Sequence, residues 1–377
     1  MAFEVPDVID LGIEASDVKA FLCSQVATGE AFTKSFGGLE HKFGRGGVHA
    51  AAANCSITEN DRFRIVDIDF CSFYPYIMLR YVPWFWHGMS REQFTSLLIE
   101  RINAKFNGKD NVANSIKQRI ATAYGLARRE NEELGFRVCA IGQLILVDLL
   151  DKLGVIGGLK VLNTNTDGVI IAYPRSEEHK LVETVEAFKA RIMIPIEYVE
   201  IHKLIQRNVN CYIAELGESF IYRNGAKCVL KPDTNQVKVK GISKDLPLIV
   251  KNAVAGALLS NKSTRSSIFS CEDLKAFAVG KSDTDKKNYR WQVKDKFMVL
   301  RDSFSIYATN DKRYGVIGYL DRGNRIQKVA GTSKHSIADT KGLMTLNALD
   351  KEHYVSMANE LVEEWREILR KEEQLHE

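Results

Sequence analysis

Residues 69–75 read DFCSFYP, and residues 165–171 read NTDGVII. Each segment places an aspartate, Asp69 or Asp167, beside an apolar and strand-like run. The run before Asp69 has β-branched residues at a period of two, so Asp67 and Asp69 should point to the same face of a strand. The DG dipeptide of the second segment separates two apolar runs, which is a strong signal for a β-hairpin. The pattern therefore predicts two strand ends that each present a carboxylate.

These two carboxylates suggest a metal site. Side by side, Asp69 and Asp167 would hold two hard divalent cations roughly 3.5–4 Å apart, the arrangement used for in-line phosphoryl transfer. Taken alone, an aspartate at a strand end is more often a turn or cap residue than a ligand. The metal-site interpretation therefore depends on the residues that lie between the two segments.

A set of basic residues lies there. Arg101 and Lys105 are four positions apart and should share one face of a helix. In the segment IKQRIATAYGLARRE, one helical stripe carries Lys117, Ala121, Tyr124 and Arg128. Guanidinium and ammonium groups directed at a two-metal centre suit a triphosphate. Tyr124 would add a flat ring for a base, and Gly125 would let nucleic acid approach closely.

Three motifs in this order resemble those of family B DNA polymerases. DFCSFYP is similar to motif A (typically D-x-x-S-L-Y-P), the segment from Lys117 to Gly125 to motif B (K-x-x-x-N-x-x-Y-G), and NTDG to motif C (D-T-D-S). The resemblance extends to KFGRGGVHA before motif A, to RNVNCYI and VKVKG after motif C, and to DKEHYVSMANELVEEW near the end, all similar to phage-encoded members. It covers most of the chain from about residue 36.

The resemblance implies a role for each matching residue. Three ligands would hold two Mg²⁺ ions, for which Mn²⁺ would substitute: Asp69, the backbone carbonyl of Phe70, and Asp167. The incoming dNTP would contact Ser72, Phe73, Tyr74, Arg101, Lys105, Lys117 and Tyr124. Tyr74 would be a steric gate beneath the sugar that leaves no room for a 2′-hydroxyl. Lys117 would be catalytic with the two aspartates and would protonate the leaving pyrophosphate.

Further residues would contact DNA by the same resemblance: Gly46, Gly47, Gly125, Tyr212, Lys238 and Lys240. The glycine-rich bend at Gly46 and Gly47 could place backbone near a template phosphate, and Tyr212 is a candidate for supporting the primer terminus. The family's primer-gripping K-x-Y pattern has Asn210 in place of its lysine. Lys238 or Lys240 would supply that charge, unless it is dispensable.

Motifs B and C depart from the family pattern. Motif C has Asn165 where the family often has its first aspartate, and Gly168 where it has serine. Asp67 could partly replace the lost charge. Motif B has Ala121 where asparagine is usual, which removes one polar contact near the nucleotide. The aspartate that the family requires is retained as Asp167, so we expect activity.

The expected fold is α+β, a right-hand polymerase with an antiparallel-sheet palm, short helical fingers and a mixed α/β thumb. Its predicted parts are a lead-in (1–45), a palm in two segments (46–88 and 136–245), fingers (89–135) and a thumb (246–377). In the thumb, a helix should open at Pro247. A final amphipathic helix should present one apolar face made of Tyr354, Ala358, Leu361 and Trp365. The aromatic segment 81–86 is expected to belong to the core.

Composition is compatible with this fold. The 377 residues are 45% hydrophobic, enough to bury a substantial core. Seven scattered cysteines without CxxC spacing argue against a disulfide framework or a zinc site and for a reducing compartment. No apolar run reaches the ~20 residues of a membrane span, and the N-terminus lacks a signal-peptide pattern. We therefore expect a cytoplasmic protein without a membrane partner, in the host cytoplasm if it is phage-encoded.

The net charge of +4 is modest, so nucleic-acid binding would have to come from local patches. Two basic stretches, residues 281–297 and 310–328, lie in the C-terminal third. They are interleaved with Tyr289, Trp291, Tyr307, Tyr314 and Tyr319. Basic residues between aromatic ones suit a surface that follows a phosphate backbone. The alternative is a solvated β-rich surface whose acids cancel much of the field.

Together these features predict a DNA-templated DNA polymerase that extends a primer 3′-hydroxyl with dNTPs. Only 68 residues precede Asp69, and no D-x-E pair with room for an exonuclease fold is found there. We therefore expect no intrinsic proofreading and a role for a separate exonuclease or processivity chain. Two alternatives stay open: a non-catalytic, polymerase-like DNA-binding subunit, and a palm polymerase that uses another template, such as RNA.

Overall fold

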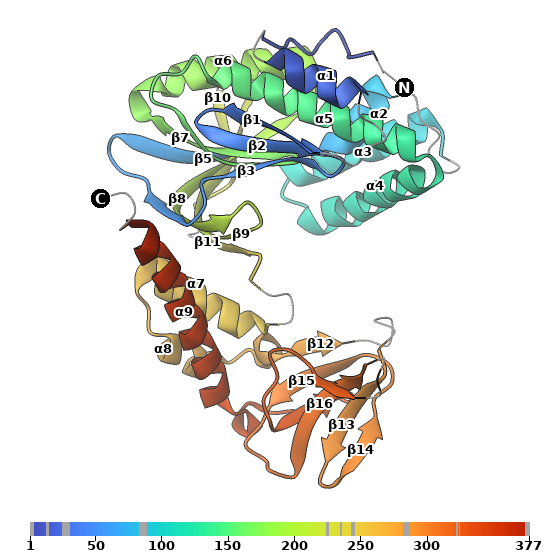
Figure 1. Cartoon of the computed structure of the whole chain (residues 1–377), viewed down its shortest axis with the longest axis vertical. Coiled ribbons are helices and arrows are strands. Elements are labelled where there is room, and N and C mark those ends of the chain that lie inside the picture. Colours follow the sequence, from blue (N-terminus) through green and yellow to red (C-terminus); the bar gives the residue numbers. More distant parts are fainter. Residues whose placement is uncertain are drawn as a thin grey trace. The chain divides into compact units, whose positions relative to one another are not determined.

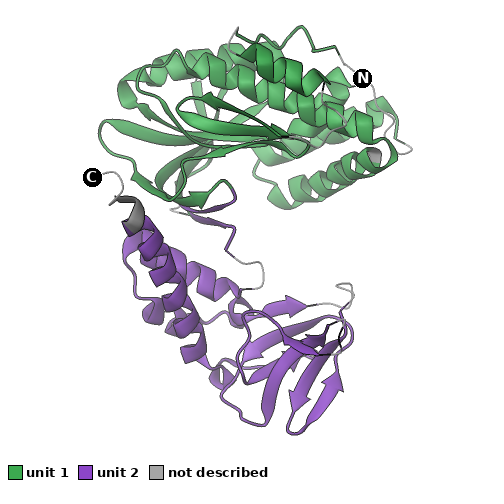
Figure 2. Cartoon of the chain, viewed as in Figure 1, with its two compact units in different colours: residues 1–209, 215–236 green, residues 210–214, 237–377 purple. Residues whose placement is uncertain are grey.

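The computed structural model describes most of the chain as two compact units. The described residues are 4–12, 15–24, 31–82, 89–223, 226–233, 236–242, 246–281, 287–321, 323 and 325–373. One unit comprises residues 1–209 and 215–236, and the other comprises residues 210–214 and 237–377 (Figure 2). Most of the aromatic segment predicted as core, residues 83–86, lies outside the described residues.

The first unit is built on a large antiparallel sheet. In the described chain the strand order is β1-β2-β3-β6-β7-β5-β8-β9-β10, with β4 paired to β8 and β11 paired to β9. The strands are β1 (Phe32–Phe36), β2 (Leu39–Gly44), β3 (Gly47–Ala51), β4 (Cys55–Thr58), β5 (Phe63–Phe70), β6 (Lys160–Asn165), β7 (Gly168–Pro174), β8 (Ile196–Asn208), β9 (Cys211–Arg223), β10 (Ala226–Lys231) and β11 (Gln236–Lys240). The predicted α+β class with an antiparallel sheet is confirmed.

Strand β5 lies between β7 and β8 and pairs with both in antiparallel register. Asp69, near its end, lies opposite Gly168 of β7 on one side and Glu197 of β8 on the other. The expected alternation is present, since Ile68 and Val66 are buried while Asp67 and Asp69 are only half-buried. Segments about a hundred or more residues apart in the sequence are thus paired neighbours at Asp69.

The predicted hairpin between β6 and β7 is confirmed, with its turn one residue earlier than the DG dipeptide suggests. Asn165 pairs with Gly168, so the two-residue loop consists of Thr166 and Asp167. Thr166 has a φ of 38°, in the left-handed region that tight hairpin turns require. A Cβ atom on Gly168 would lie 2.8 Å from the Ile68 carbonyl oxygen. Glycine therefore lets β7 approach β5 closely.

Three helices cover one face of this sheet: α1 (Ser16–Ser24), α5 (Glu132–Leu153) and α6 (Glu178–Ile192), the last preceded by the 3-10 turn η2 (Arg175–Glu177) (Figure 1). Helix α5 is buried along most of its length because its sequence is apolar nearly all round. Asp148 of α5 accepts two hydrogen bonds of 2.8 Å from Arg191. It also accepts one of 2.9 Å from the backbone of Asp10. This ion pair joins α5 to the end of α6 and to the N-terminal segment.

Helices α2 (Phe73–Tyr81), α3 (Arg91–Phe106) and α4 (Asp110–Glu130) follow β5 and precede α5. Pro75 lies in the first turn of α2, where its missing N–H costs no hydrogen bond. Helix α3 begins with a capping box in which Ser90 and Gln93 exchange side-chain and backbone hydrogen bonds. The chain from 89 to 135, predicted as fingers, is therefore helical.

The second unit combines helices with two small sheets. Its helical elements are α7 (Leu248–Ser260), α8 (Thr264–Phe269), η3 (Leu274–Phe277), η5 (Leu346–Ala348) and α9 (Lys351–Glu373). A sheet of order β12-β15-β18 is formed by Val279–Lys281, Phe304–Ala308 and Ser336–Asp339. A second, of order β14-β13-β16-β17, is formed by Lys296–Val299, Tyr289–Val293, Tyr314–Leu320 and Ile326–Lys328.

Both helices expected in this unit are present. Helix α7 begins at Leu248, directly after Pro247. In α9, Tyr354, Ala358 and Trp365 are buried and Leu361 is half-buried, as the predicted apolar face requires. The aromatic residues between the helices serve mainly as core. Tyr289 and Tyr307 are buried and therefore cannot stack on bases, which corrects part of the predicted binding surface.

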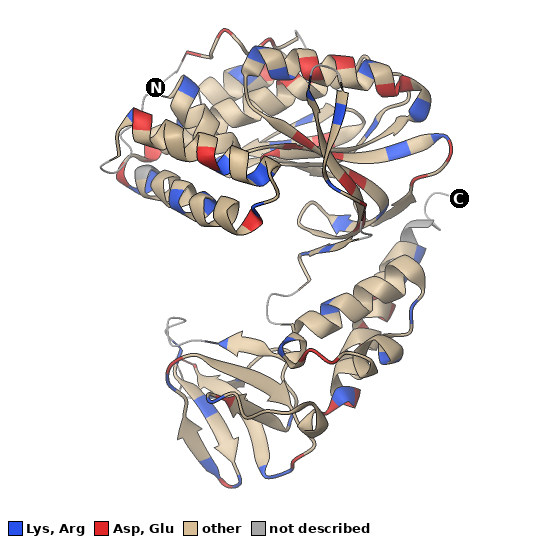
Figure 3. Ribbon diagram, turned by 180° about the vertical axis from the view of Figure 1, so that it is seen from behind, with Lys and Arg blue, Asp and Glu red and all other residues tan. Residues whose placement is uncertain are grey.

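Charges of both signs are distributed over each unit (Figure 3), as expected from the small net charge. All seven cysteines are free thiols, which agrees with the prediction of no disulfide framework. Among the helices in the described part of the chain, none combines the length and apolar character that crossing a bilayer requires.

Candidate active site

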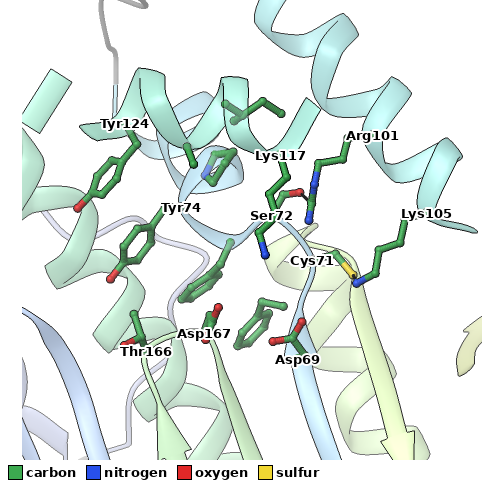
Figure 4. Close-up of a pocket in the computed structure, with 15 residues that line it drawn as sticks. Asp69, Cys71, Ser72, Tyr74, Arg101, Lys105, Lys117, Tyr124, Thr166 and Asp167 are labelled. Carbon is green, nitrogen blue, oxygen red and sulfur yellow. Dashed lines mark hydrogen bonds between the residues drawn. The ribbon is translucent and has the colours of Figure 1, made fainter. Parts of the chain in front are cut away.

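A cavity of about 340 Å³ lies in the first unit where the end of β5, the β6–β7 turn and helices α2, α3 and α4 meet (Figure 4). Ten of the residues predicted from the sequence line it: Asp69, Phe70, Ser72, Phe73, Tyr74, Arg101, Lys105, Lys117, Tyr124 and Asp167. Its size lies in the usual range for small-molecule sites, roughly 300–1,000 Å³. Metal ligands and nucleotide contacts predicted from separate motifs therefore line one cavity.

The two aspartates are brought together by strand pairing. Asp69 is the penultimate residue of β5, and Asp167 is in the adjacent turn. The backbone N–H of Phe70 donates a 2.9 Å hydrogen bond to the carbonyl oxygen of Asp167. Because Gly168 permits a close approach of β7, this backbone contact holds both carboxylates at the same edge of the cavity.

The environment of Asp69 disfavours its charge. Burial is the main reason that the pKa of Asp69 lies well above its ordinary value, and the negative charges of Asp167 and Asp67 raise it further. Repulsion between carboxylates is relieved when a cation binds among them. Asp67 is two residues earlier on the same face and does not line the cavity.

Glu197 is an acidic residue of this site that the motifs did not indicate. It is buried, lies directly opposite Asp69 on β8, and forms an ion pair with Lys105. Burial lowers the pKa of Lys105, but nearby groups, among them Glu197 and Asp69, outweigh it and raise that pKa above its ordinary value. Lys105 also lies 3.6 Å from the Cys71 sulfur. Glu197 thus holds Lys105 at the cavity. The sequence could have indicated this role of Glu197 only if its pairing with Asp69 on the adjacent strand had been known.

Arg101 reaches the cavity from α3 and is largely buried, with 8% of its surface exposed. Its Nη1 donates a hydrogen bond to the Ser72 hydroxyl. Ser72 has a φ of 56°, a conformation that residues other than glycine seldom adopt. The Nε of Arg101 is buried and has no hydrogen-bond partner among the described residues. A buried donor without a partner is costly, so this nitrogen is an unmet hydrogen-bonding group beside the cavity.

Lys117 points into the cavity from α4, opposite the two aspartates (Figure 4). No ion pair of Lys117 occurs within the part of the chain that the structure describes. The predicted stripe of α4 is largely present, since Ala121 and Tyr124 line the cavity as well. Arg128, further along α4, does not line it and packs against Gly135.

Aromatic rings form one wall of the cavity. Phe70 stacks on Phe73 with 4.5 Å between ring centroids, and Tyr74 lies 5.0 Å from Tyr124. Burial, followed by contact with Cys139, raises the pKa of both Tyr74 and Tyr124, so their hydroxyls stay protonated at neutral pH. The Tyr124 hydroxyl lies 3.0 Å from the Cys139 sulfur. Cys139 is a second residue that the motifs did not indicate.

The residues predicted to contact DNA lie outside the cavity lining. Gly46 is in the β2–β3 turn, and Gly47 is the first residue of β3. Gly47 has a φ of 120°, and a Cβ on it would lie 3.0 Å from the Thr166 hydroxyl. Gly125 is exposed on α4.

The other three predicted DNA contacts belong to the second unit. Tyr212 is buried, with the ammonium groups of Lys238 and Lys240 each 5.5 Å from its ring centroid. The structure therefore groups the tyrosine with both candidate lysines.

The donor set for a metal consists of two carboxylates and a backbone carbonyl. Among the described residues, no group of three or more histidine, cysteine or acidic side chains is arranged to hold a metal ion. Asp69 and Asp167 are oxygen donors of the kind that Mg²⁺ prefers, and Mg²⁺ usually binds one or two carboxylates together with substrate phosphates. The chemistry of these donors therefore fits such an ion.

Comparison with known proteins identifies no close relative. No family model matches the chain, and no curated protein matches its sequence. Among solved structures, the chain is similar to the family B DNA polymerase from the hyperthermophilic archaeon Pyrobaculum calidifontis, with a TM-score of 0.37 and 13% sequence identity. The match covers 87% of this chain and 47% of that polymerase, so the chain spans about half its length. A likeness this distant establishes no shared family, and function has to be argued from the cavity.

Proposed function

We propose that the chain is a DNA-templated DNA polymerase of family B, similar to phage members, which extends a primer with dNTPs. One observation carries the proposal: a single cavity has two carboxylates at one edge and Arg101, Lys105 and Lys117 around it. Carboxylates suit divalent cations, and the three basic groups suit a triphosphate. This combination is what nucleotidyl transfer requires.

Asp69, Asp167 and the Phe70 carbonyl would hold Mg²⁺ in this proposal. When bound, such ions supply Lewis-acid activation of the attacking hydroxyl and neutralise charge on the phosphates. Burial and the nearby carboxylates raise the pKa of Asp69, and a bound cation would favour its ionised form.

The three basic residues of the cavity would have different roles in binding the triphosphate. Arg101 places a largely buried guanidinium at the cavity, and such a group suits phosphate oxygens. Lys105 is already paired with Glu197 and therefore contributes less net charge. Lys117 is exposed on α4 and directed into the cavity, so it can bind the β- and γ-phosphates and donate a proton to the leaving pyrophosphate.

The aromatic wall would bind the nucleoside. Tyr74 lies beside the motif A backbone and would contact the deoxyribose, leaving no space for a 2′-hydroxyl. Tyr124 would lie against the nascent base pair. In this scheme the sheet of the first unit is the palm, α3 and α4 are the fingers, and the second unit is the thumb.

The test is primer extension on a DNA primer-template with Mg²⁺ and dNTPs, comparing wild type with Asp167→Asn. We expect wild type to extend the primer and the variant to lose at least about a thousandfold in rate, since one metal ligand is removed. Glu183→Gln, which changes an exposed carboxylate on α6, is the matched control and should keep full activity.

The same assay separates the alternatives. Extension on an RNA template with none on DNA would replace this proposal with an RNA-directed polymerase. Binding of the duplex without extension by wild type would indicate a non-catalytic subunit. Equal rates for wild type and Asp167→Asn would show that the cavity is not the catalytic site.

A further inference from the structure

The Tyr74 ring lies between the cavity and helix α5. Tyr74 lines the cavity, whereas Gly142 of α5 does not. A Cβ atom built on Gly142 would lie 3.2 Å from Tyr74 Cε1 and 3.1 Å from Phe73 Cε1. These distances are shorter than most real Cβ contacts, so the α5 backbone touches the ring from behind. Only a residue without a side chain allows this separation.

Cys139 limits the same ring near its hydroxyl. It precedes Gly142 by three positions and therefore faces the same side of α5. Its sulfur is buried and lies 3.0 Å from the Tyr124 hydroxyl. It is also near enough to the Tyr74 hydroxyl to contribute to the raised pKa of Tyr74. The two rings lie with centroids 5.0 Å apart. Tyr74 is therefore held by Gly142 at its back and by Cys139 and Tyr124 at its hydroxyl end.

We infer that Cys139 and Gly142 are specificity-determining positioning residues: they set how far the Tyr74 ring reaches toward the sugar, and so how strongly the site rejects ribonucleotides. The inference rests on the proposed function, because it concerns the sugar specificity of that site. A steric gate acts by leaving too little space for one hydroxyl group. Displacing its ring by a few tenths of an ångström therefore changes the discrimination between sugars.

Gly142→Ala tests the contact at the back of the ring. Alanine favours a helix more than glycine does, and the backbone of Gly142 is ordinary helix, so the added methyl acts mainly on Phe73, Tyr74 and Ile77. Those side chains must yield by a few tenths of an ångström, away from α5 and toward the cavity. We expect the ratio of kcat/KM for dNTP over rNTP to rise roughly tenfold.

Cys139→Ala tests the contact at the hydroxyl end. Removing the sulfur takes away the hydrogen-bond partner of Tyr124, whose ring lies against that of Tyr74. The Tyr74 ring should then become less confined, and the same ratio should fall roughly tenfold. Cys139→Ser restores a hydrogen-bonding group of similar size and should bring the ratio back to within about threefold of wild type. This variant keeps the inference testable if Gly142→Ala does not fold.

If Cys139 and Gly142 act by positioning the Tyr74 ring, the effect of their substitution must disappear when that ring is removed. A general structural effect would remain. In a Tyr74→Ala background, neither α5 substitution should change the sugar ratio, since the ring on which they act is absent. Gly256→Ala is the matched control, because this helical glycine of α7 has only ordinary contacts with Lys262. It should leave the ratio unchanged.

The outcomes are separable from those of the proposed function. Wild-type extension with dNTPs reports on the polymerase activity alone. Suppose that wild type extends the primer but the dNTP-to-rNTP ratio is unchanged in Gly142→Ala and Cys139→Ala. Only the positioning inference is then overturned. The same holds if these substitutions change the ratio as much in the Tyr74→Ala background as in wild type. If wild type extends no primer, both proposals fail.

Discussion

Asp69 and Glu197 are two adjacent acidic residues whose roles depend on the side chains around them. They lie opposite one another on adjacent strands, where two negative charges would repel. Lys105 reduces the repulsion by pairing with Glu197, which leaves Asp69 as the carboxylate that faces the cavity. In the proposed function, Glu197 holds a lysine and Asp69 would bind a cation.

Glu197→Gln should raise the KM for dNTPs about tenfold with a smaller change in kcat. The reason is that Lys105 loses the partner that keeps its ammonium group at the cavity. Steady-state primer extension measures both constants. Glu200→Gln is the control, because Glu200 is on the same strand but pairs with Arg64 and Lys227 instead. An unchanged KM in Glu197→Gln would mean that Lys105 does not contact the nucleotide.

Gly168→Ala should destabilise the protein by about 1–3 kcal/mol and slow primer extension. Its Cβ would lie 2.8 Å from the Ile68 carbonyl oxygen and 3.3 Å from Asp69 Cα, so β7 must move away from β5. Urea unfolding measures the first effect. Gly280→Ala in β12, where a Cβ would meet nothing within 4 Å, is the control. Equal stability of the two variants would contradict the close approach.

At the scale of elements, the site depends on short connections between regular structures. The two-residue turn between β6 and β7 places Asp167, and the left-handed Ser72 places the start of α2 directly after β5. Helix α3 directs Arg101 and Lys105 at the cavity, and helix α4 directs Lys117 together with Tyr124 at it, because residues four or seven apart share a helix face. The shared helix faces and the hairpin were predicted from the sequence, whereas the left-handed conformation of Ser72 was not.

Strand β8 also takes part in a pH-dependent contact through His202. Its ring nitrogens lie 2.5 Å from Glu59 and 2.9 Å from Asp233. Partial burial alone would lower the pKa of His202, but the hydrogen bonds to Glu59 and Asp233 outweigh it and raise the pKa above 6.5. A raised pKa in the folded state means that the protonated form stabilises the fold.

The free energy of unfolding should therefore contain a contribution from His202 that is fully present below pH 6.5 and is lost as the pH rises through the raised pKa. Urea unfolding across this pH range should show the loss in wild type and not in His202→Gln. His179→Gln changes a histidine whose side chain is 95% exposed and should behave like wild type. A His202→Gln variant with the wild-type pH profile would rule out the contact.

At the scale of the whole molecule, the proposed function would require the chain to bind a polyanion with a net charge of only +4. Binding must then depend on particular basic residues rather than on the overall field. Lys238 and Lys240, grouped on Tyr212 in the second unit, are the candidates that the sequence indicated for the primer strand.

Replacing Lys238 and Lys240 with glutamine should reduce the slope of log K against log salt for DNA binding by about 1–2, since each lost phosphate contact contributes roughly 0.9. Fluorescence anisotropy with labelled duplex at several salt concentrations measures the slope. Lys19→Gln with Lys180→Gln removes the same total charge from exposed positions on α1 and α6 and is the control. An equal slope in both double variants would exclude a local contact.

Patterns of period two and period 3.6, together with the DG signal, were enough to predict β5, the β6–β7 hairpin, the basic helices and the two helices of the second unit. They succeed because strand and helix periodicity and turn chemistry act over a few residues. Glu197, Cys139 and the contact of Gly142 with Tyr74 could not be predicted in this way, and neither could the burial of Tyr289 and Tyr307. Each depends on which distant segments become neighbours, and pairing register and core packing are decided only when the whole chain has folded.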